Sequence, residues 1–309
     1  MGNVFKARLS REYINRVPFL DFKNLLVRIN KMSKVEEIRI VYQPFESDLD
    51  TSFFFEGDEH KEALARLIYL ITDKGTGMGA LTGEIGSGKS LLLKVLREKL
   101  DTNYYLQVYL NTPFLEFDNI LSEVIYQILK FSKRNITSIP EKKFDKMKLF
   151  EYLITEQLPA ENKHLLIMID EAHILSTNCL QEIKFLSNYN HSSNASMTII
   201  LTGQTELKAT LRQSPEIYQR LGMFYHLNYM QKNKILPYLN YRLEKAEADP
   251  LIQFDEMGID DLYNFSKGCP RQINRVAKLA LHKSVSEYCP FISKQTLNTI
   301  INDISMHFG

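Results

Sequence analysis

The stretch Gly83-Glu84-Ile85-Gly86-Ser87-Gly88-Lys89-Ser90 decides the fold of this protein. It has the form GxxxxGK[ST], it follows an apolar run at residues 78–82, and it precedes a segment with apolar residues at helical spacing. Glycines in such a loop let backbone N–H groups wrap phosphate oxygens, and the N-terminus of the next helix faces their negative charge. The sequence therefore predicts a phosphate-binding loop between a strand and a helix.

The loop also predicts two cofactors, ATP and Mg²⁺. Lys89 has the position from which a lysine reaches the β and γ phosphates, and Ser90 has the position that offers a hydroxyl oxygen to the metal. We expect the nucleotide to be surrounded by Gly83, Glu84, Ile85, Gly86, Ser87, Gly88, Lys89, Ser90 and Leu91.

Alternating strand and helix patterns predict an α/β core over residues 42–230. Apolar runs at residues 78–82, 105–110, 165–169 and 198–201 are separated by segments with helical periodicity. Strands buried on both faces and divided by helices are typical of a parallel sheet sandwiched by helices. Asp58 is a plausible N-cap of the first core helix, which we expect the glycines at 75 and 77 to stop.

The core is flanked by two smaller predicted parts. From about residue 231 the strand signal disappears and helical patterns take over, so residues 231–309 are expected to form a helical lid domain. Its last helix is expected to begin at Ser293, with Ile292 and Leu297 at the spacing of a hydrophobic staple. Residues 1–41 are expected to form a helical appendage and hold nine Lys or Arg against four Asp or Glu, a net charge of +5.

Two acids follow the third apolar run, at Asp170 and Glu171. Parallel strands present the residues at their carboxyl ends to the same edge of the sheet, where the phosphate-binding loop also lies. Hydrolysis of a nucleotide needs a carboxylate for the magnesium shell and a group that orients water. We expect Asp170, with Ser90, to hold Mg²⁺ and Glu171 to polarise the attacking water.

Polar and cationic residues elsewhere complete the predicted catalytic set. Gln204 follows the fourth strand and is our choice to sense the γ-phosphate, with Thr202 second. Arg271 opens a helix of the predicted lid and is expected to reach the phosphates from there. Arg220 is the candidate arginine finger for a neighbouring subunit, and Arg212 competes for that role.

Two further features have two interpretations each. The aromatic run at residues 53–55 could frame the adenine ring or form a hydrophobic plug against the sheet. His173, which follows the acids, could touch the site or face solvent.

Composition limits the class of protein. Charged residues make up 24% of the 309 residues and the net charge is +1, which is the balance of a globular chain without a global basic field. No apolar run is long enough to span a membrane and the start has no signal-peptide pattern, so we expect a cytoplasmic protein without membrane insertion. The three cysteines are far apart, and we expect reduced thiols.

Several of these motifs together resemble those of the ExeA-type AAA+ ATPases. The resemblance runs from about Tyr42 to Tyr288 and depends on the aromatic run, His60, the phosphate-binding loop, the acids, the Gly203-Gln204 turn and the segment 268–274. It implies a parallel sheet of the P-loop NTPase kind, a helical lid, and a homo-oligomer, ring or filament, with ATP at the subunit interfaces.

The resemblance implies two alternative roles. One is an ATP-driven switch that assembles with or remodels a protein machine, as in secretion or export. The other is a DNA-binding regulator like the TnsC-like and TniB-like transposition ATPases, in which basic residues of the appendage and of residues 130–148 would contact phosphates. A nucleotide-binding scaffold that never hydrolyses ATP is a third alternative, against which the presence of both acids argues.

Overall fold

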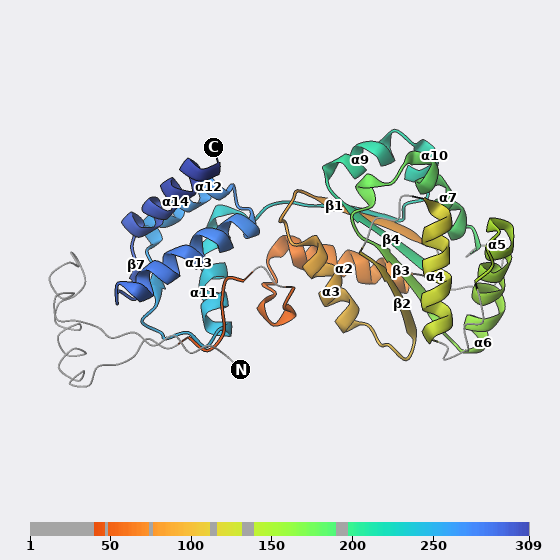
Figure 1. The fold of residues 1–309 in the computed structure, drawn as a ribbon, viewed down its shortest axis with the longest axis horizontal. Helices are drawn as coiled ribbons and strands as arrows, with labels where there is room; N and C mark the ends of the chain where they lie inside the picture. The colour runs from red at the N-terminus through yellow and green to blue at the C-terminus, as the bar shows by residue number, and fades with distance from the viewer. Residues whose placement is uncertain are drawn as a thin grey trace. The chain divides into compact units, whose positions relative to one another are not determined.

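A computed structural model describes residues 40–46, 49–73, 77–111, 116–131, 139–189 and 197–308. These residues form two compact units, which Figure 1 shows as ribbons. One unit comprises Glu56–Asn228, and the other comprises Tyr229–Gly309 together with the residues that precede Glu56. The expected basic appendage lies outside the described residues as far as residue 39, and so does part of the basic segment at 130–148.

The first unit is built on a parallel sheet of five strands, as the sequence predicts. The strands are β1 (Met78–Gly83), β2 (Tyr105–Leu110), β3 (His164–Ile169), β4 (Met197–Gly203) and β5 (Met223–Leu227). Their order across the sheet is β2-β3-β4-β1-β5, and every neighbouring pair is parallel. Strand β1 thus lies inside the sheet, between β4 and β5, and the chain leaves its carboxyl end through the glycine-rich loop.

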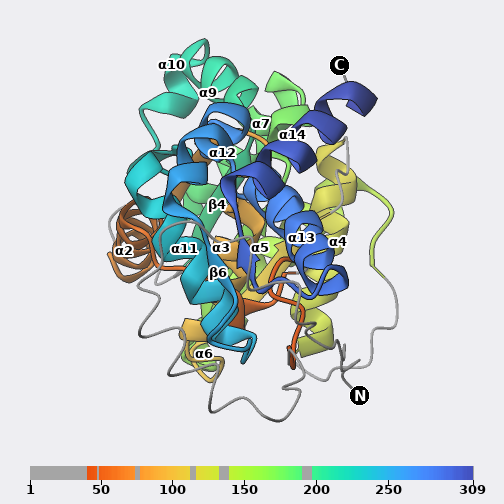
Figure 2. The same ribbon diagram turned by 90° about the vertical axis from the view of Figure 1, so that its left-hand side faces the viewer.

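Helices cover both faces of this sheet, so the predicted α/β sandwich is confirmed (Figures 1 and 2). Leu165, Ile167 and Ile169 of β3 belong to a buried core shared with helices on one side. Successive strand residues point to opposite faces, so the buried Leu166 and Met168 face the other side. The helices are α2 (Asp58–Thr72), α3 (Lys89–Lys99), α4 (Phe117–Phe131), α5 (Lys143–Tyr152), α6 (Leu158–Ala160), α7 (Thr177–Ser187), α9 (Thr205–Arg212) and α10 (Pro215–Tyr218), with short helical segments η3 (Leu153–Gln157) and η4 (Ala172–Ile174).

Strand β5 was not predicted. It lies at the edge of the sheet, only its two end residues are buried, and it contains Tyr225 and His226 between them. Strand β5 therefore lacks the apolar run by which the other four strands were identified. At the start of α2 the N-cap is Gly57, with Asp58 as the first helical residue, and the helix ends at Thr72, before the glycines expected to stop it.

The second unit is mainly helical. It contains α11 (Lys232–Lys245), α12 (Ile259–Ser266), α13 (Pro270–Ser286) and α14 (Lys294–Phe308), with 3-10 turns η2 (Thr51–Phe53) and η5 (Glu256–Gly258). The sequence has no strand signal in this part, yet β6 (Gln253–Phe254) pairs in parallel with β7 (Phe291–Ile292). Two residues are too few to show a strand periodicity in sequence.

The predicted start of the last helix is confirmed. The Ser293 hydroxyl accepts a hydrogen bond of 3.2 Å from the backbone N–H of Thr296, which is the N-cap geometry. Ile292 and Leu297 are both fully buried on either side of this cap, as a hydrophobic staple requires.

The aromatic run at residues 53–55 packs in the helical unit. Phe55 makes edge contacts with the rings of Tyr238 and Tyr241 of α11, and the Arg242 guanidinium lies 5.0 Å from the centre of the Phe53 ring. Phe53 and Phe55 thus pack against α11, a contact that neither interpretation had included. Residues 42–55, which we placed with the α/β core, group with the helical unit.

None of the helices in the described ranges is long and apolar enough to cross a membrane.

Candidate nucleotide-binding site

The glycine-rich loop joins the inner strand β1 to α3 and has glycines where the backbone requires them. Gly86 has φ of 78° and Gly88 has φ of 100°, in the left-handed region that side chains rarely adopt. A Cβ atom at Gly83 would lie 2.6 Å from the carbonyl oxygen of Leu227 on β5. The loop therefore has the tight turn from which successive N–H groups can face an anion.

Lys89 brings a buried positive charge into this loop. Its Nζ donates to the carbonyl oxygens of Gly83 (2.7 Å) and Glu84 (2.9 Å), and the residue is 8% exposed. The hydroxyl of Ser87 is also buried, and it has no hydrogen-bond partner among the described residues. A buried hydroxyl gains stability from an acceptor, so both side chains fit a phosphate group in the loop.

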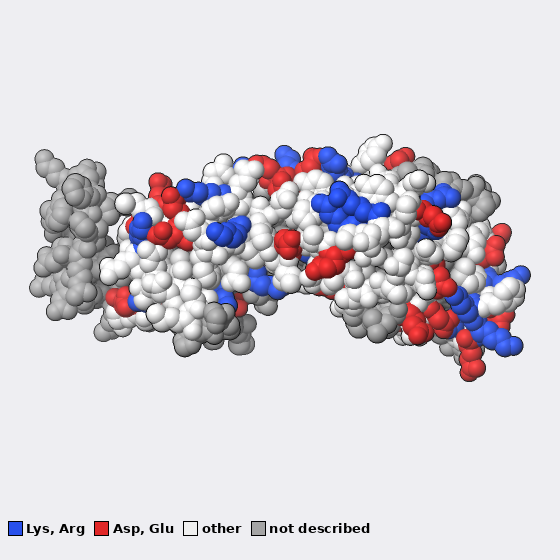
Figure 3. Space-filling model, turned by 90° about the horizontal axis from the view of Figure 1, so that it is seen from above, with Lys and Arg blue, Asp and Glu red and all other residues white. Residues whose placement is uncertain are grey.

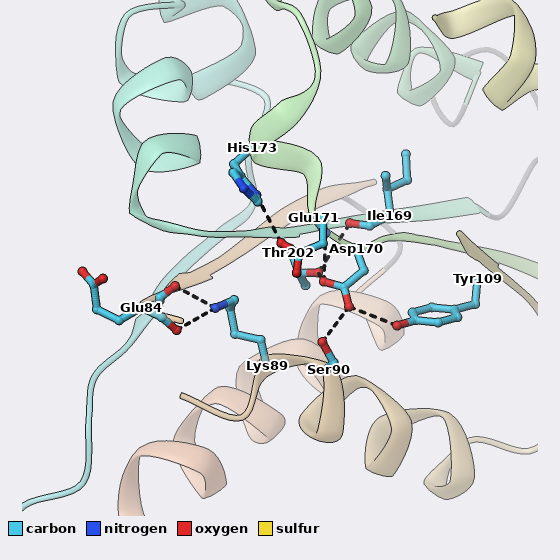
Figure 4. A network of polar contacts seen from close by, with 10 residues as sticks. Glu84, Lys89, Ser90, Tyr109, Ile169, Asp170, Glu171, His173 and Thr202 are labelled. Carbon is cyan, nitrogen blue, oxygen red and sulfur yellow. Dashed lines mark hydrogen bonds and ion pairs between the residues drawn. The ribbon is translucent and has the colours of Figure 1, made fainter. Parts of the chain in front are cut away.

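Asp170 is the centre of a hydrogen-bond network at the carboxyl ends of the strands (Figure 4). Its Oδ2 accepts from the Ser90 hydroxyl (2.7 Å) and the Tyr109 hydroxyl (3.0 Å). Its Oδ1 accepts from the Thr202 hydroxyl (2.6 Å) and the backbone N–H of Glu171 (2.9 Å). Two carboxylate oxygens offer about four acceptor sites. The four donors therefore fix the orientation of this side chain.

The pair formed by Ser90 and Asp170 fits a magnesium ion. Both were predicted as its ligands, and the structure places the hydroxyl and carboxylate oxygens in direct contact across the loop. Mg²⁺ prefers oxygen ligands and takes only one or two from protein side chains, the rest coming from phosphate and water.

Glu171 follows with an unusual backbone conformation. Its φ of 54° lies in the left-handed region and turns the chain directly into η4. Its Oε2 lies 3.3 Å from Nδ1 of His173, within ion-pair distance but without the alignment of a hydrogen bond. The His173 side chain is only 14% exposed. His173 thus contacts the second acid and does not face solvent, which decides between its two interpretations.

The two candidate sensors of the γ-phosphate differ in whether they contact Asp170. Thr202 reaches Asp170 directly, and it is fully buried. Gln204 is the N-cap residue of α9 and is half-buried, but no hydrogen bond joins its side chain to either acid. The structure therefore brings our second choice, Thr202, into the network, while a sensor role for Gln204 stays a prediction.

The predicted arginines all lie near ends of helices. Arg212 is the last residue of α9 and Arg220 follows α10, and both are exposed. Arg271 is exposed in the first turn of α13, in the helical unit. Gly268 before it has φ of 82° and approaches Met230 so closely that a Cβ would lie 2.0 Å from its carbonyl oxygen. The roles of these arginines remain predictions.

Sequence reasoning missed Tyr109 and a contact between the loop and α9. Tyr109 lies on the less buried face of β2, next to the last residue of the strand, and so reaches Asp170 beyond the end of β3. The Thr205 hydroxyl donates a 2.7 Å hydrogen bond to Oε1 of Glu84. A polar residue near the end of a predicted strand was the available signal for Tyr109, but the edge position of β2 could not be read from the sequence.

Comparison with known proteins agrees with this geometry. Residues 72–211 match the family described as AAA domain. The chain is 29% identical over 243 residues to General secretion pathway protein A of Aeromonas hydrophila, a match that covers 77% of this chain and 42% of that protein. The chain thus spans less than half the length of this relative.

Solved structures share the fold at low sequence identity. The Aeropyrum pernix ORC2 protein in its ADPNP-ADP complexes has a TM-score of 0.61 at 16% identity, covering 82% of this chain and 70% of that chain. The Walker-type ATPase PABY2304 of Pyrococcus abyssi has a TM-score of 0.56 at 16% identity, covering 85% and 76%. Cdc6p from Pyrobaculum aerophilum has a TM-score of 0.57 at 15% identity, covering 79% and 68%.

Proposed function

We propose that this chain, whose residues 72–211 match the AAA domain family, binds ATP with Mg²⁺ and hydrolyses it. The observation that carries the proposal is the contact between Ser90 and Asp170, which joins the phosphate-binding loop to the acids at the end of β3. A loop alone supports binding, whereas hydrolysis also needs these carboxylates in reach of the phosphates.

In this proposal the loop holds the triphosphate and the strand ends manage the metal. The N–H groups of residues 84–91 bind phosphate oxygens, and Lys89 exchanges its contacts with the Gly83 and Glu84 carbonyls for the β and γ phosphates. Ser90 and Asp170 would hold Mg²⁺, which lowers the negative charge that the reaction develops. Thr202 and Tyr109 keep the Asp170 carboxylate turned toward Ser90.

Glu171 is the proposed general base. Its carboxylate accepts a proton from the attacking water while the oxygen of that water forms a bond to the γ-phosphorus, and the bond to the β-γ bridging oxygen breaks. Its neighbour His173, 3.3 Å away, limits the positions that the carboxylate can take. Gln204 remains the proposed γ-phosphate sensor, at the start of α9.

The proposed result of ATP binding and hydrolysis is a change in an assembly of subunits. Arg220 is the proposed finger that completes the site of a neighbouring subunit, and Arg271 is the proposed link between nucleotide and helical unit. Figure 3 shows a group of Lys and Arg side chains on one face of the first unit. Arg212 and Arg220 are exposed, at the end of α9 and shortly after α10. Such exposed cations fit a surface that contacts the phosphates of the nucleotide bound by a second copy of this chain.

The proposed role is that of an ATP-driven switch in a protein machine, as the name of the secretion-pathway relative suggests. The switch needs ATP, so we place it in the cytoplasm, where its three free cysteines would stay reduced.

Calorimetry and a phosphate-release assay test the proposal. The wild type is expected to bind ATP in the presence of Mg²⁺, and Lys89→Ala to lose this binding. Lys99→Ala removes a lysine from the far end of the same helix and should bind as the wild type does. Absence of any heat with Mg²⁺ and ATP, at all protein concentrations tried, would refute the proposal.

A second variant tests hydrolysis separately from nucleotide binding. Glu171→Gln is expected to bind ATP with unchanged affinity and to lose turnover by about 100-fold or more, because an amide cannot take the proton from water. Glu98→Gln, an exposed acid on α3, is the matched control. Turnover at the wild-type rate in Glu171→Gln would remove this residue from the mechanism.

A further inference from the structure

A histidine outside the glycine-rich loop contacts its backbone. Nε2 of His60, in the first turn of α2, lies 3.1 Å from the carbonyl oxygen of Ser87. A carbonyl oxygen only accepts hydrogen bonds, so the ring donates and carries its proton on Nε2. The proposed chemistry of the site does not use this residue, yet it contacts the peptide directly before Lys89.

The contact controls a peptide that a phosphate would use. The Ser87 carbonyl and the Gly88 N–H belong to one planar peptide group and point in opposite directions. The Ser87 oxygen lies outside the ladder of α3, whose first bond runs from Leu92 N–H to Gly88 O (2.9 Å). The N–H groups of a first helical turn have no partner in the helix and can bind an anion. Holding the carbonyl toward α2 therefore aims the Gly88 N–H away from α2.

We infer that His60 is a positioning residue of the nucleotide site: it fixes the peptide between Ser87 and Gly88 so that the Gly88 N–H faces the phosphates of a nucleoside di- or triphosphate. The inference rests on the proposed function, because it names how the same site is kept ready for its ligand. Burial lowers the pKa of His60, outweighing the Ser87 carbonyl and Glu59, which both raise it, so the ring is neutral at pH 7.

The loop and the histidine fit together closely. A Cβ atom at Gly88 would lie 2.9 Å from Nε2 of His60, and φ at this residue is 100°. No side chain fits between α2 and the loop at this point. The ring therefore lies directly against the backbone of the loop.

The turn that carries His60 is itself anchored to the edge strand. Oε2 of the preceding residue, Glu59, accepts hydrogen bonds from the Tyr225 hydroxyl (3.2 Å), from Asn228 N–H (3.3 Å) and from Asn228 Nδ2 (3.1 Å). About two turns further along α2, the Arg66 guanidinium lies 5.3 Å from the centre of the Tyr225 ring. The start of α2 is thus fixed to β5, which gives His60 a rigid base from which to hold the loop.

Three substitutions at this position separate a positioning role from a packing role. The amide nitrogen of Gln lies about as far along the side chain as Nε2 of histidine, whereas that of Asn corresponds to Nδ1. The probe is ADP, titrated calorimetrically with EDTA present, so that neither metal nor hydrolysis contributes. His60→Ala and His60→Asn are expected to bind ADP about 3- to 10-fold more weakly, the effect of losing one hydrogen bond. His60→Gln should restore wild-type affinity, and Lys61→Ala, an exposed neighbour, should not change it.

The outcomes distinguish this inference from the proposal on which it rests. A wild-type protein that binds no nucleotide would overturn both. If the wild type binds ADP and His60→Ala and His60→Asn bind it as tightly as the wild type does, the inference alone is overturned. The same holds if His60→Asn and His60→Gln do not differ in ADP affinity. The thermal midpoint without nucleotide is measured for each variant, because a lowered midpoint with unchanged ADP affinity would mark His60 as a packing residue. If His60→Ala does not fold, the Asn and Gln pair decides.

Discussion

The hydroxyl of Thr202 donates a 2.6 Å hydrogen bond to Oδ1 of Asp170, which links the carboxyl ends of two neighbouring strands. The register explains the contact, because Ile169 of β3 pairs with Leu201 of β4 and each polar residue comes one position later. Oδ2 of the same carboxylate contacts Ser90 in the phosphate-binding loop. Thr202 is therefore the residue through which β4 can influence the proposed metal ligand.

Thr202→Val is expected to lower kcat of ATP hydrolysis by about 10-fold, the effect of losing one buried hydrogen bond to a charged group. Valine keeps the shape and removes the donor, so ADP affinity in EDTA should stay unchanged. Thr202→Ser, which keeps the hydroxyl, is the matched control and should retain most activity. Steady-state kinetics of the three proteins test this, and a serine variant as slow as the valine variant would show that the methyl group matters instead.

Tyr109→Phe is expected to raise the Mg²⁺ concentration needed for half-maximal hydrolysis by about 3- to 10-fold, because Asp170 loses one of the donors that orient it. The ring should stay in place, since the Arg97 guanidinium lies 4.9 Å from its centre. Burial and the adjacent Asp170 hold the pKa of Tyr109 well above its usual value. The hydroxyl therefore keeps its proton, and the difference between the two proteins should be the same from pH 6 to pH 9.

Tyr105→Phe is the control for that experiment. It makes the same change on the same strand, at the end far from the acids, and should leave the Mg²⁺ dependence unchanged. An equal effect of both substitutions would place the cause in the packing of β2 and not in the hydrogen bond to Asp170.

The centre of the site could be predicted from sequence because its residues are fixed by local rules. Gly86 and Gly88 are needed for left-handed backbone, and Lys89 and Ser90 follow at a set spacing. Asp170 and Glu171 could be placed because a fully buried strand has a continuous apolar run that ends where they begin. These features need no knowledge of which strands are neighbours.

The partners of these residues could not be predicted, since they depend on strand order. Tyr109 reaches Asp170 because β2 lies beside β3, and Thr202 does so because β4 lies on the other side. Glu59 and Tyr225 meet because β5 takes the edge next to β1, and that strand has too few buried residues to be identified from its sequence. Pairings across a sheet are long-range, and a single sequence carries no signal for them.

Arg242→Met is expected to lower the free energy of unfolding of the helical unit by about 2–4 kcal/mol. Its buried guanidinium donates to the carbonyl oxygens of Pro44 and Glu46 and to the Tyr238 hydroxyl, so methionine would leave these oxygens without a donor. Lys245→Met, an exposed lysine at the end of the same helix, is the control and should change the free energy by less than about 0.5 kcal/mol. Urea unfolding followed by circular dichroism measures both, and equal stability of the two variants would contradict the prediction.

Mixing two inactive variants tests whether Arg220 acts on a neighbouring subunit. Arg220→Ala should still bind ATP but lose turnover by at least about 100-fold, because a finger stabilises the charge of the transition state. Lys89→Ala binds no nucleotide but keeps Arg220 intact. In a mixed oligomer the first variant supplies a filled site and the second supplies the arginine, so phosphate release should return when the two are combined.

Repeating the mixture with Arg212→Ala in place of Arg220→Ala identifies which of the two exposed arginines completes the site. Full activity of Arg220→Ala by itself, or a mixture that stays inactive although the subunits co-assemble, would exclude Arg220 from this role.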